Sequence, residues 1–314
     1  MRAICATRRN FSIPKNSNIY KLLAPRTPTC PWCGRFEMLE RHKEEKKRAR
    51  LNPLKTAVNG RDSDVLAMVA RALKYKEVML AFQPVVLAGN HRRLAFHEGL
   101  IRVLDDTGRI IPAKDFISAI EGTELGRQVD CLALELGLRE LARYPDLRLS
   151  INLSAPALHD RRWLKTLEHG LARLDTIAER LILEITEATV MADPEQVLPA
   201  MDALQMRGIS FALDDFGAGQ TALRYFTDFD FDILKIDGRF VRGIDSSADK
   251  QAIASALTSI GKHFDMFTVA EHVESQQEAK TLAKIGVDCL QGYFFGAPTI
   301  SPPWHSAPCG KKRA

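Results

Sequence analysis

The chain has 314 residues, and its 46% hydrophobic and 26% charged side chains exclude a fibrous or wholly disordered protein. Its net charge of +5 is unevenly distributed, because residues 1–61 carry 15 Lys and Arg against 4 Asp and Glu, whereas residues 62–314 carry 29 basic and 35 acidic side chains. An acidic body does not attract polyanions over its whole surface, so a phosphate substrate would need a local site with a metal or a few placed cations.

The apolar runs and the cysteines set the expected location. No run of about 18 apolar residues occurs, so the sequence predicts no membrane-spanning helix. The 6 cysteines are too few in a chain of this length for a disulfide scaffold. We therefore expect a cytoplasmic protein that has no membrane partner and no nucleic-acid partner.

Residues 1–61 are predicted to be a basic, flexible N-terminal extension, because they offer few apolar positions to bury. They contain Cys30-Pro31-Trp32-Cys33, which suits either metal or redox chemistry or an incidental turn. The charged run Arg41–Arg50 suits either a solvated helix or a contact with nucleic acid or acidic lipid.

From residue 62 the sequence alternates short apolar runs with amphipathic stretches. A helix is predicted over Val65–Tyr75, and Asp193 followed by Pro194 predicts a later helix start. The alternation over residues 62–302 is typical of a (β/α)8 TIM-like barrel, with residues 303–314 as a tail. A doubly wound open sheet competes, but no glycine-rich dinucleotide turn follows any strand. The predicted strands are Val78–Leu87, Leu94–Leu100, Leu147–Leu153, Leu181–Thr186, Ile209–Leu213, Ile233–Ile236, Phe267–Ala270 and Val287–Leu290.

Polar side chains stand at the C-terminal edges of these apolar runs. Because such edges meet at one face of a parallel barrel, we expect the side chains to gather there. One lysine is too little to neutralise five or six acids, and an unpaired buried carboxylate is costly, so divalent cations are the natural complement. Oxygen ligands with an amide suit Mg²⁺ or Mn²⁺ better than zinc, and adjacent aspartates suit two ions. The polar residues at the ends of the apolar runs are Glu98, Asn152, Glu184, Asp214 with Asp215, Lys235 with Asp237, Glu271 and Gln291.

At these positions the chain resembles the EAL domain family of cyclic di-GMP phosphodiesterases, over residues from about 64 to 302. The motifs that carry the resemblance are Phe82-Gln83-Pro84-Val85-Val86, Glu98-Gly99-Leu100-Ile101-Arg102, Ile151-Asn152-Leu153-Ser154, Glu184-Ile185-Thr186-Glu187, Asp214-Asp215-Phe216-Gly217-Ala218-Gly219, Lys235-Ile236-Asp237, Ala270-Glu271-His272-Val273-Glu274 and Gln291-Gly292-Tyr293-Phe294-Phe295-Gly296. The resemblance implies an EAL-type (β/α)8 barrel with one antiparallel strand near Val78–Leu100.

The resemblance also implies an activity: hydrolysis of cyclic di-GMP to the linear dinucleotide pGpG, which lowers the level of this second messenger. The cofactors would be two Mg²⁺ or Mn²⁺ ions per site, with Ca²⁺ inhibiting. A homodimer is expected, which light scattering would test. Two cations would neutralise the phosphodiester and lower the pKa of a bridging water, which then attacks in line with the leaving 3′ oxygen.

Roles carry over position by position from the resemblance. The implied metal ligands are Glu98, Asn152, Glu184 and Asp214 for one ion and Asp214 with Asp215 for the second, with Glu271 and Gln291 holding ligands or water. Lys235, Glu271 and Glu98 are expected to act in catalysis, and Lys235 would orient the attacking water. Gln83, Arg102 and Asp237 are expected to contact the substrate, with Arg102 gripping a phosphate. Glu187 would anchor the loop after Asp215, and Glu274 would be a supporting acid.

The sequence departs from the family pattern at several positions. Gly99 replaces an alanine, and Gln220-Thr221-Ala222 replace an aromatic residue and two serines in a loop linked to dimer-coupled metal binding. His272 replaces a glycine and is either an extra ligand or a residue beside the site. A catalytically weak or inactive cyclic di-GMP receptor that signals through partner contacts is therefore the alternative to the enzyme.

Overall fold

The computed structural model describes residues 53–217 and 228–306 of the chain. The barrel belongs to the unit formed by residues 61–314. The predictions made for Cys30, Cys33 and Arg41–Arg50 lie outside the described residues, as do those for Gln220-Thr221-Ala222. Within the part that is described, no helix is long and apolar enough to cross a membrane.

Nine strands form one sheet that closes on itself. Going round the barrel, the order is β1-β9-β8-β7-β6-β5-β4-β2, and β2 pairs again with β1, while β3 is attached outside the ring to β2. Closure excludes the doubly wound open sheet. The strands are β1 Val78–Leu87, β2 Asn90–Leu104, β3 Ile110–Pro112, β4 Leu149–Asn152, β5 Leu181–Thr186, β6 Ser210–Phe216, β7 Ile233–Ile236, β8 Phe267–Ala270 and β9 Cys289–Gln291.

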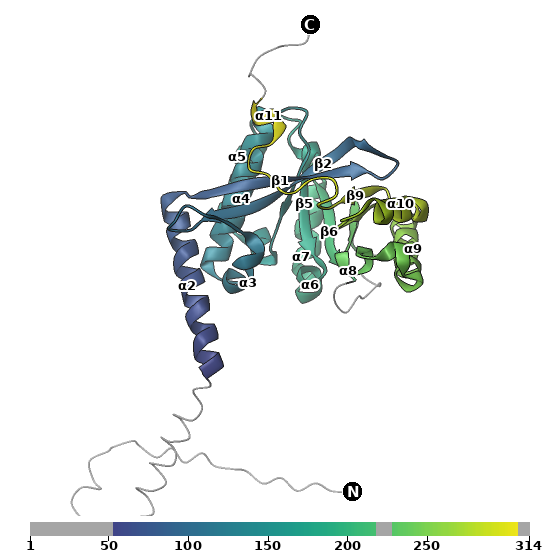
Figure 1. Cartoon of the computed structure of the whole chain (residues 1–314). Coiled ribbons are helices and arrows are strands. Elements are labelled where there is room, and N and C mark those ends of the chain that lie inside the picture. Colours follow the sequence, from purple (N-terminus) through teal and green to yellow (C-terminus); the bar gives the residue numbers. More distant parts are fainter. Residues whose placement is uncertain (1–52, 218–227, 307–314) are drawn as a thin grey trace, which may run out of the picture. The chain divides into compact units, whose positions relative to one another are not determined.

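Helices surround the barrel strands, as Figure 1 shows. Asp193 caps α7 by accepting a hydrogen bond from the Gln196 backbone N–H, so the predicted helix start is confirmed. The helix predicted over Val65–Tyr75 begins earlier, at Pro53, because proline is well tolerated in the first turn of a helix. The helices are α2 Pro53–Tyr75, α3 Ile117–Ile120, α4 Glu124–Arg143, α5 Arg161–Leu171, α6 Glu187–Ala192, α7 Pro194–Gln205, α8 Gly238–Val241, α9 Ala248–His263, α10 Gln276–Ile285 and α11 Pro303–Ser306.

Strand β1 runs antiparallel to both of its neighbours, and the other neighbouring pairs of the ring are parallel. The chain enters the barrel through a β1–β2 hairpin, visible in Figure 1 as the longest ribbon of the sheet. A tight hairpin joins antiparallel strands, whereas parallel neighbours need a crossover connection. The resemblance therefore predicted the antiparallel strand correctly, and the strands predicted from apolar runs are all present.

Two layers of apolar side chains make the core. Most of the buried residues lie between the strands and the surrounding helices. A smaller cluster lies inside the barrel, and each of its members comes from a different strand: Val85, Phe96, Ile182, Ala212, Ile233, Val269 and Cys289. This interior cluster fills the barrel, as expected for a ring of this strand number, and forms a floor beneath one of its mouths.

Candidate metal-dependent active site

A polar layer lies directly above this apolar floor, and its position follows from strand geometry. Successive side chains of a strand point to opposite faces, so the residue two positions beyond an inward-facing residue also faces inward. Two positions beyond Ile182 stands Glu184, and two beyond Ala212 stands Asp214. The antiparallel β1 contributes in the reverse direction, with Gln83 two positions before Val85. Each strand of the ring places one polar residue at this mouth: Gln83, Glu98, Asn152, Glu184, Asp214, Lys235, Glu271 and Gln291.

Lys235 is the centre of the polar layer. Its ammonium is fully buried and lies 2.6 Å from Glu184 Oε2, 2.8 Å from Glu271 Oε1 and 2.9 Å from Asp214 Oδ1. Glu98 Oε2 lies at 3.7 Å. These carboxylates come from four separate strands or strand ends, so one cation draws four parts of the barrel together.

The adjacent aspartates reach the same site because the strand is irregular there. In a regular strand Asp214 and Asp215 would point to opposite faces. The register with β7 shifts between Leu213 and Phe216, and Asp215 adopts a left-handed conformation with φ 55°. Such a conformation costs on the order of 1 kcal/mol outside glycine. As a result, carboxylate oxygens of Asp214, Asp215 and Glu271 lie within 4.8 Å of one another.

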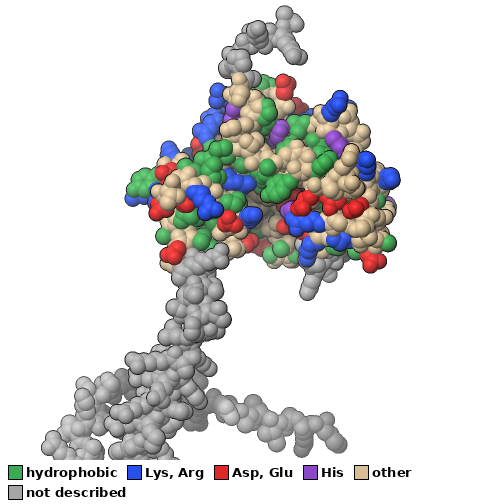
Figure 2. All heavy atoms as spheres, viewed as in Figure 1, with side chains coloured by type: hydrophobic (Ala, Val, Ile, Leu, Met, Phe, Trp, Pro, Cys, Tyr) green, Lys and Arg blue, Asp and Glu red, His purple; other side chains and the backbone are tan. Residues whose placement is uncertain are grey.

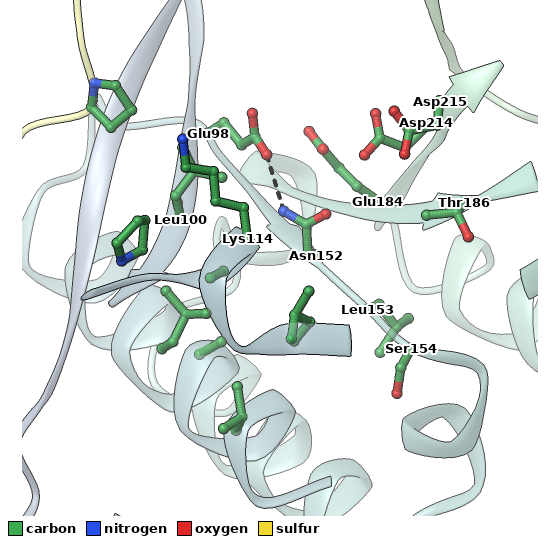
Figure 3. A pocket seen from close by; sticks show the side chains of 18 of the residues that line it. Glu98, Leu100, Lys114, Asn152, Leu153, Ser154, Glu184, Thr186, Asp214 and Asp215 are labelled. Carbon is green, nitrogen blue, oxygen red and sulfur yellow. Dashed lines mark hydrogen bonds between the residues drawn. The ribbon is translucent and has the colours of Figure 1, made fainter. Parts of the chain in front are cut away.

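Amide side chains position Glu98 from the other side of the mouth. Asn152 Nδ2 donates to Glu98 Oε1 at 3.0 Å, and Gln291 Nε2 donates to Glu98 Oε2 at 2.5 Å. Gln291 Nε2 also lies 3.2 Å from Gln83 Oε1, while Gln83 Nε2 donates to the Gly296 carbonyl. Figure 3 shows Glu98, Asn152, Glu184, Asp214 and Asp215 directed into one space, with a dashed line between Asn152 and Glu98.

Burial and mutual repulsion disfavour full ionisation of these acids near neutral pH in the absence of a further cation. Burial raises the pKa of Glu184 to about 8, and neighbouring carboxylates add to this while Lys235 opposes it. Burial likewise raises the pKa of Glu271 well above its ordinary value and that of Asp215 to about 6. Burial opposes ionisation of Glu98 as well, but Lys235 and the two amides outweigh it and lower the pKa. Despite burial, the surrounding carboxylates raise the pKa of Lys235 well above its ordinary value.

The donor set fits divalent cations. Glu184 Oε1 and Gln291 Oε1 are buried, and neither accepts a hydrogen bond from the residues that the structure describes. Carboxylate and amide oxygens of this kind are the ligands that Mg²⁺ and Mn²⁺ prefer, and Asp214, Asp215 and Glu271 converge as a metal site requires. An added cation would satisfy these oxygens and favour the ionised carboxylates.

The polar layer opens into a cavity of about 940 Å³. Figure 2 shows the face of the molecule that carries it, with a hollow near the centre and acidic side chains along one edge. A cavity of this size accommodates a ligand of several rings. Its walls extend well beyond the acids, to β2, to the short helix after β3 and to α4.

The family model of the EAL domain matches residues 66–298, over the whole of the barrel ring described above. This chain belongs to the EAL domain family. Among similar proteins are the bifunctional diguanylate cyclase/cyclic di-GMP phosphodiesterase MucR of Pseudomonas aeruginosa, 30% identical over 73% of this chain and 34% of that protein, and the cyclic di-GMP phosphodiesterase PdeF of Escherichia coli, 29% identical over 75% and 32%. The chain thus spans about a third of the length of these relatives.

A solved structure of the PaMucR phosphodiesterase in complex with c-di-GMP has the same fold. It is 28% identical, covers 78% of this chain and 100% of its own, and superposes with a TM-score of 0.70. The fold and the family are therefore established from two directions, the sequence and the backbone.

Three further residues predicted for the site of this EAL domain lie at or near the cavity. Arg102 lines the cavity, and its Nη1 donates to the Ile101 carbonyl at 2.9 Å. Glu187 Oε2 accepts from the Gly217 backbone N–H at 3.3 Å, just after Asp215, where a loop anchor was expected. Glu274 lines the cavity and pairs with Arg242 at 3.3 Å.

Asp237 is not among the residues that line the cavity. Its carboxylate caps α8 by accepting from the Arg239 backbone N–H at 2.6 Å and from Arg239 Nε at 3.1 Å. The structure therefore gives it a helix-capping role, and the expected contact with the substrate stays a prediction.

His272 stands next to Glu271 but outside the cluster of convergent acids among the described residues. It lines the cavity in a left-handed conformation with φ 56° and packs over Gly238, where an added Cβ would lie 2.7 Å from His272 Cβ. The position therefore borders the site and adds bulk to the cavity wall.

One wall of the cavity was not predicted from the sequence. Strand β3 and the 3-10 helix η1 (Ala113–Asp115) were not predicted, because three-residue elements carry no periodicity. The helix α4 was not singled out either. Pro112 at the end of β3 was the available signal, since proline within sheets occurs mainly in edge strands. Ser154, Thr186 and Tyr293 stand in the sequence motifs but were given no role there. Cavity residues found only in the structure include Lys114, Glu121, Arg127, Asp130 and Thr189.

Proposed function

We propose that this chain hydrolyses cyclic di-GMP to linear pGpG, with the polar layer of the barrel holding two divalent cations. The observation that carries the proposal is that each ring strand delivers one polar residue to the same mouth, above an apolar floor. Membership of the EAL family and the names of the relatives supply the substrate class.

The residues at the mouth divide into those that hold the cations and those that hold the substrate. Glu98, Asn152, Glu184, Asp214, Asp215, Glu271 and Gln291 are proposed as the ligand set. When bound, Mg²⁺ or Mn²⁺ would neutralise the phosphodiester and make a water nucleophilic near neutral pH. Gln83 positions Gln291 and through it Glu98, as their hydrogen bonds show. Arg102 is placed to bind a phosphate oxygen.

Lys235 has a supporting role under this proposal. Because it contacts Glu184, Asp214 and Glu271 within 2.9 Å, it fixes their relative positions before any cation arrives. Its raised pKa keeps the ammonium charged throughout the physiological pH range. Its charge would help to stabilise the negative charge that develops at a phosphate bound in this mouth, where electrostatic stabilisation is most effective.

The decisive experiment compares the wild type with Asp214→Asn in the presence of Mg²⁺ or Mn²⁺ and cyclic di-GMP. We expect the wild type to release pGpG and the variant to turn over at least ~10³-fold more slowly, a loss of about 4 kcal/mol in transition-state stabilisation. Chromatographic separation of the nucleotides measures both rates.

Asp202→Asn is the matched control, because Asp202 lies exposed on α7, away from the cavity. We expect it to keep wild-type turnover. Tight binding of cyclic di-GMP in Ca²⁺ without product in Mg²⁺ or Mn²⁺ would reject the enzyme and establish the receptor instead. Unchanged hydrolysis by Asp214→Asn would reject the assignment of the site.

A further inference from the structure

The cavity has a second charged region, on the wall that β2 forms beyond Glu98. Glu98, Leu100 and Arg102 alternate along β2 and therefore share the face that lines the cavity. Arg102 stands opposite Pro112 in the antiparallel pairing of β2 with β3. The helix η1 follows at once, and because β3 runs antiparallel to β2, the chain beyond Pro112 continues from Arg102 in the direction of Leu100 and Glu98, which puts Lys114 on the Glu98 side of Pro112.

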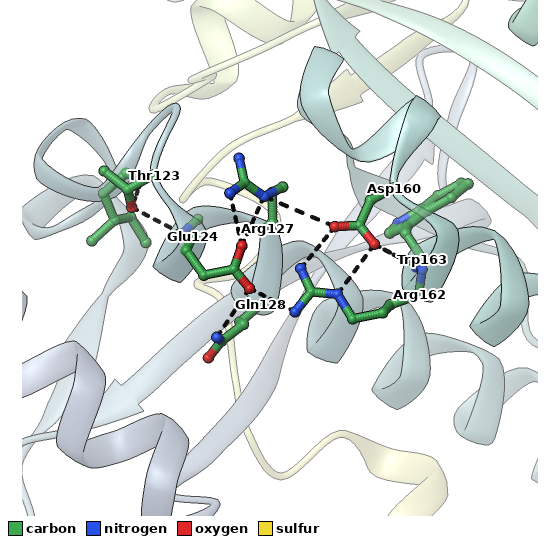
Figure 4. A network of polar contacts seen from close by, with 9 residues as sticks. Thr123, Glu124, Arg127, Gln128, Asp160, Arg162 and Trp163 are labelled. Carbon is green, nitrogen blue, oxygen red and sulfur yellow. Dashed lines mark hydrogen bonds and ion pairs between the residues drawn. The ribbon is translucent and has the colours of Figure 1, made fainter.

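The cationic side chains on the cavity wall differ in whether they already form ion pairs with carboxylates. Among the described residues that line the cavity, the permanently charged ones are Arg102, Lys114 and Arg127. Arg127 is committed elsewhere, because its guanidinium pairs with Glu124 at 2.7 Å and with Asp160 at 3.9 Å. Figure 4 shows this network, in which Arg162 binds the same two carboxylates. Arg127 is therefore not available to a ligand without breaking surface ion pairs.

Lys114 is uncommitted. Its side chain makes no hydrogen bond and no ion pair with any residue in the described ranges 53–217 and 228–306. An exposed lysine is usually a solvated surface residue, but this one lines the cavity, and Figure 3 shows it extending from η1 toward the side that carries Glu98. Its position beside Arg102 creates a local positive region within an otherwise acidic cavity.

A cyclic dinucleotide has two phosphodiesters, and only one can occupy the acidic mouth at a time. The other must lie elsewhere in the cavity, away from the carboxylates that would repel it. We propose that Lys114, together with Arg102, binds the phosphodiester that is not hydrolysed. The inference rests on the proposed function and deepens it, because it makes a second phosphate a requirement for tight binding.

A contact to the phosphate that does not react is the same in the ground state and the transition state. Removing it raises KM and leaves kcat unchanged, whereas a contact to the reacting phosphate would lower kcat. We expect Lys114→Ala to raise both KM and the Kd of cyclic di-GMP in Ca²⁺ about fivefold to tenfold, with kcat within about twofold of the wild type. Lys114→Arg should restore most of the affinity, because it restores the charge.

Lys165→Ala is the matched control, since Lys165 is exposed on α5 and does not line the cavity. It removes the same charge and should leave KM and Kd unchanged. The difference between wild type and Lys114→Ala should shrink at high salt, where the Debye length falls to about 3 Å.

The outcomes separate the two proposals. If the wild type binds cyclic di-GMP and Lys114→Ala binds it equally well, or if Lys114→Ala lowers kcat in proportion to kcat/KM, the role of Lys114 is wrong and the proposed function stands. If the wild type neither binds nor hydrolyses cyclic di-GMP, the proposed function is wrong and the role of Lys114 falls with it.

Discussion

Gly99 illustrates how a single residue beside the site is fixed by its neighbours. A methyl group at this position would lie 2.7 Å from Ile151 Cδ1 and 3.3 Å from the Ser150 carbonyl oxygen. Ile151 Cδ1 also packs closely against helix α4, because a methyl group on Gly137 of that helix would lie 2.9 Å from it. The glycine that replaces the alanine of the EAL motif therefore makes room for a bulkier residue on the neighbouring strand β4.

This packing predicts a specific interaction between two substitutions. Gly99→Ala should lower the free energy of unfolding by about 1 kcal/mol. Overpacking costs ~1–3 kcal/mol, and replacing a glycine within a strand stabilises the folded state by ~0.5–1 kcal/mol, because alanine loses less backbone entropy on folding. In an Ile151→Val background the crowded methyl is gone, so the same change should be neutral or stabilising. Urea unfolding of the four proteins in a double-mutant cycle measures the coupling. An equal cost in both backgrounds would contradict this account.

At the scale of elements, the C-terminal segment fastens the β1–β2 hairpin from outside. Thr299 pairs with Phe82 through two backbone hydrogen bonds of 2.8 and 3.1 Å. Trp304 of α11 packs edge-on against Phe82 and His97, with ring centroids at 5.2 and 4.5 Å. Its indole N–H donates to Glu140 of α4 at 3.2 Å. Because Phe82 and His97 adjoin Gln83 and Glu98, this contact supports the strands that carry the site.

Replacing Trp304 tests the fastening. Trp304→Ala should lower the free energy of unfolding by roughly 2 kcal/mol, less than a fully buried tryptophan because the side chain is only half-buried. Trp304→Phe keeps the ring packing and loses the hydrogen bond, so about half of that cost is expected. Denaturant unfolding followed by circular dichroism checks both. An alanine variant as stable as the wild type would show that α11 contributes nothing to the barrel.

For the whole molecule, the crowded acids link stability to pH and to metal. The pKa values of Glu184, about 8, and Asp215, about 6, lie above those of the unfolded chain. Between about pH 5 and pH 8 the folded state therefore binds more protons than the unfolded state, and the stability of the metal-free protein falls as pH rises. Cations favour the ionised carboxylates and oppose this fall.

We expect the metal-free protein to lose on the order of 2 kcal/mol of unfolding free energy between about pH 5.5 and pH 8. Excess Mg²⁺ or Mn²⁺ should remove most of this loss, and affinity for the ions should rise over the same interval. Urea unfolding in chelator and in metal across the pH range measures it. Glu184→Gln should weaken the pH dependence, and parallel curves with and without metal would rule out the linkage.

The sequence by itself determined the strands and the polar layer, because both follow from local patterns. A residue such as Glu184 is recognised as inward-facing from its place in a short apolar run, and parallel strands must bring such residues to one mouth. The direction of β1 did not follow from its own composition. It came from the family resemblance and was confirmed by the pairing of β1 with its neighbours.

Only the tertiary structure decided what depends on contacts between segments far apart in the chain. The left-handed conformation of Asp215 brings two adjacent carboxylates to the same site, and the sequence Asp214-Asp215 by itself does not predict it. The elements β3 and η1 are too short to produce a periodic pattern in the sequence. The place of Lys114 on the same cavity wall as Arg102 therefore follows only from the pairing of β2 with β3. Which charges are already paired is likewise a property of three-dimensional neighbours, because the energy of an ion pair depends on distance and burial and not on sequence separation.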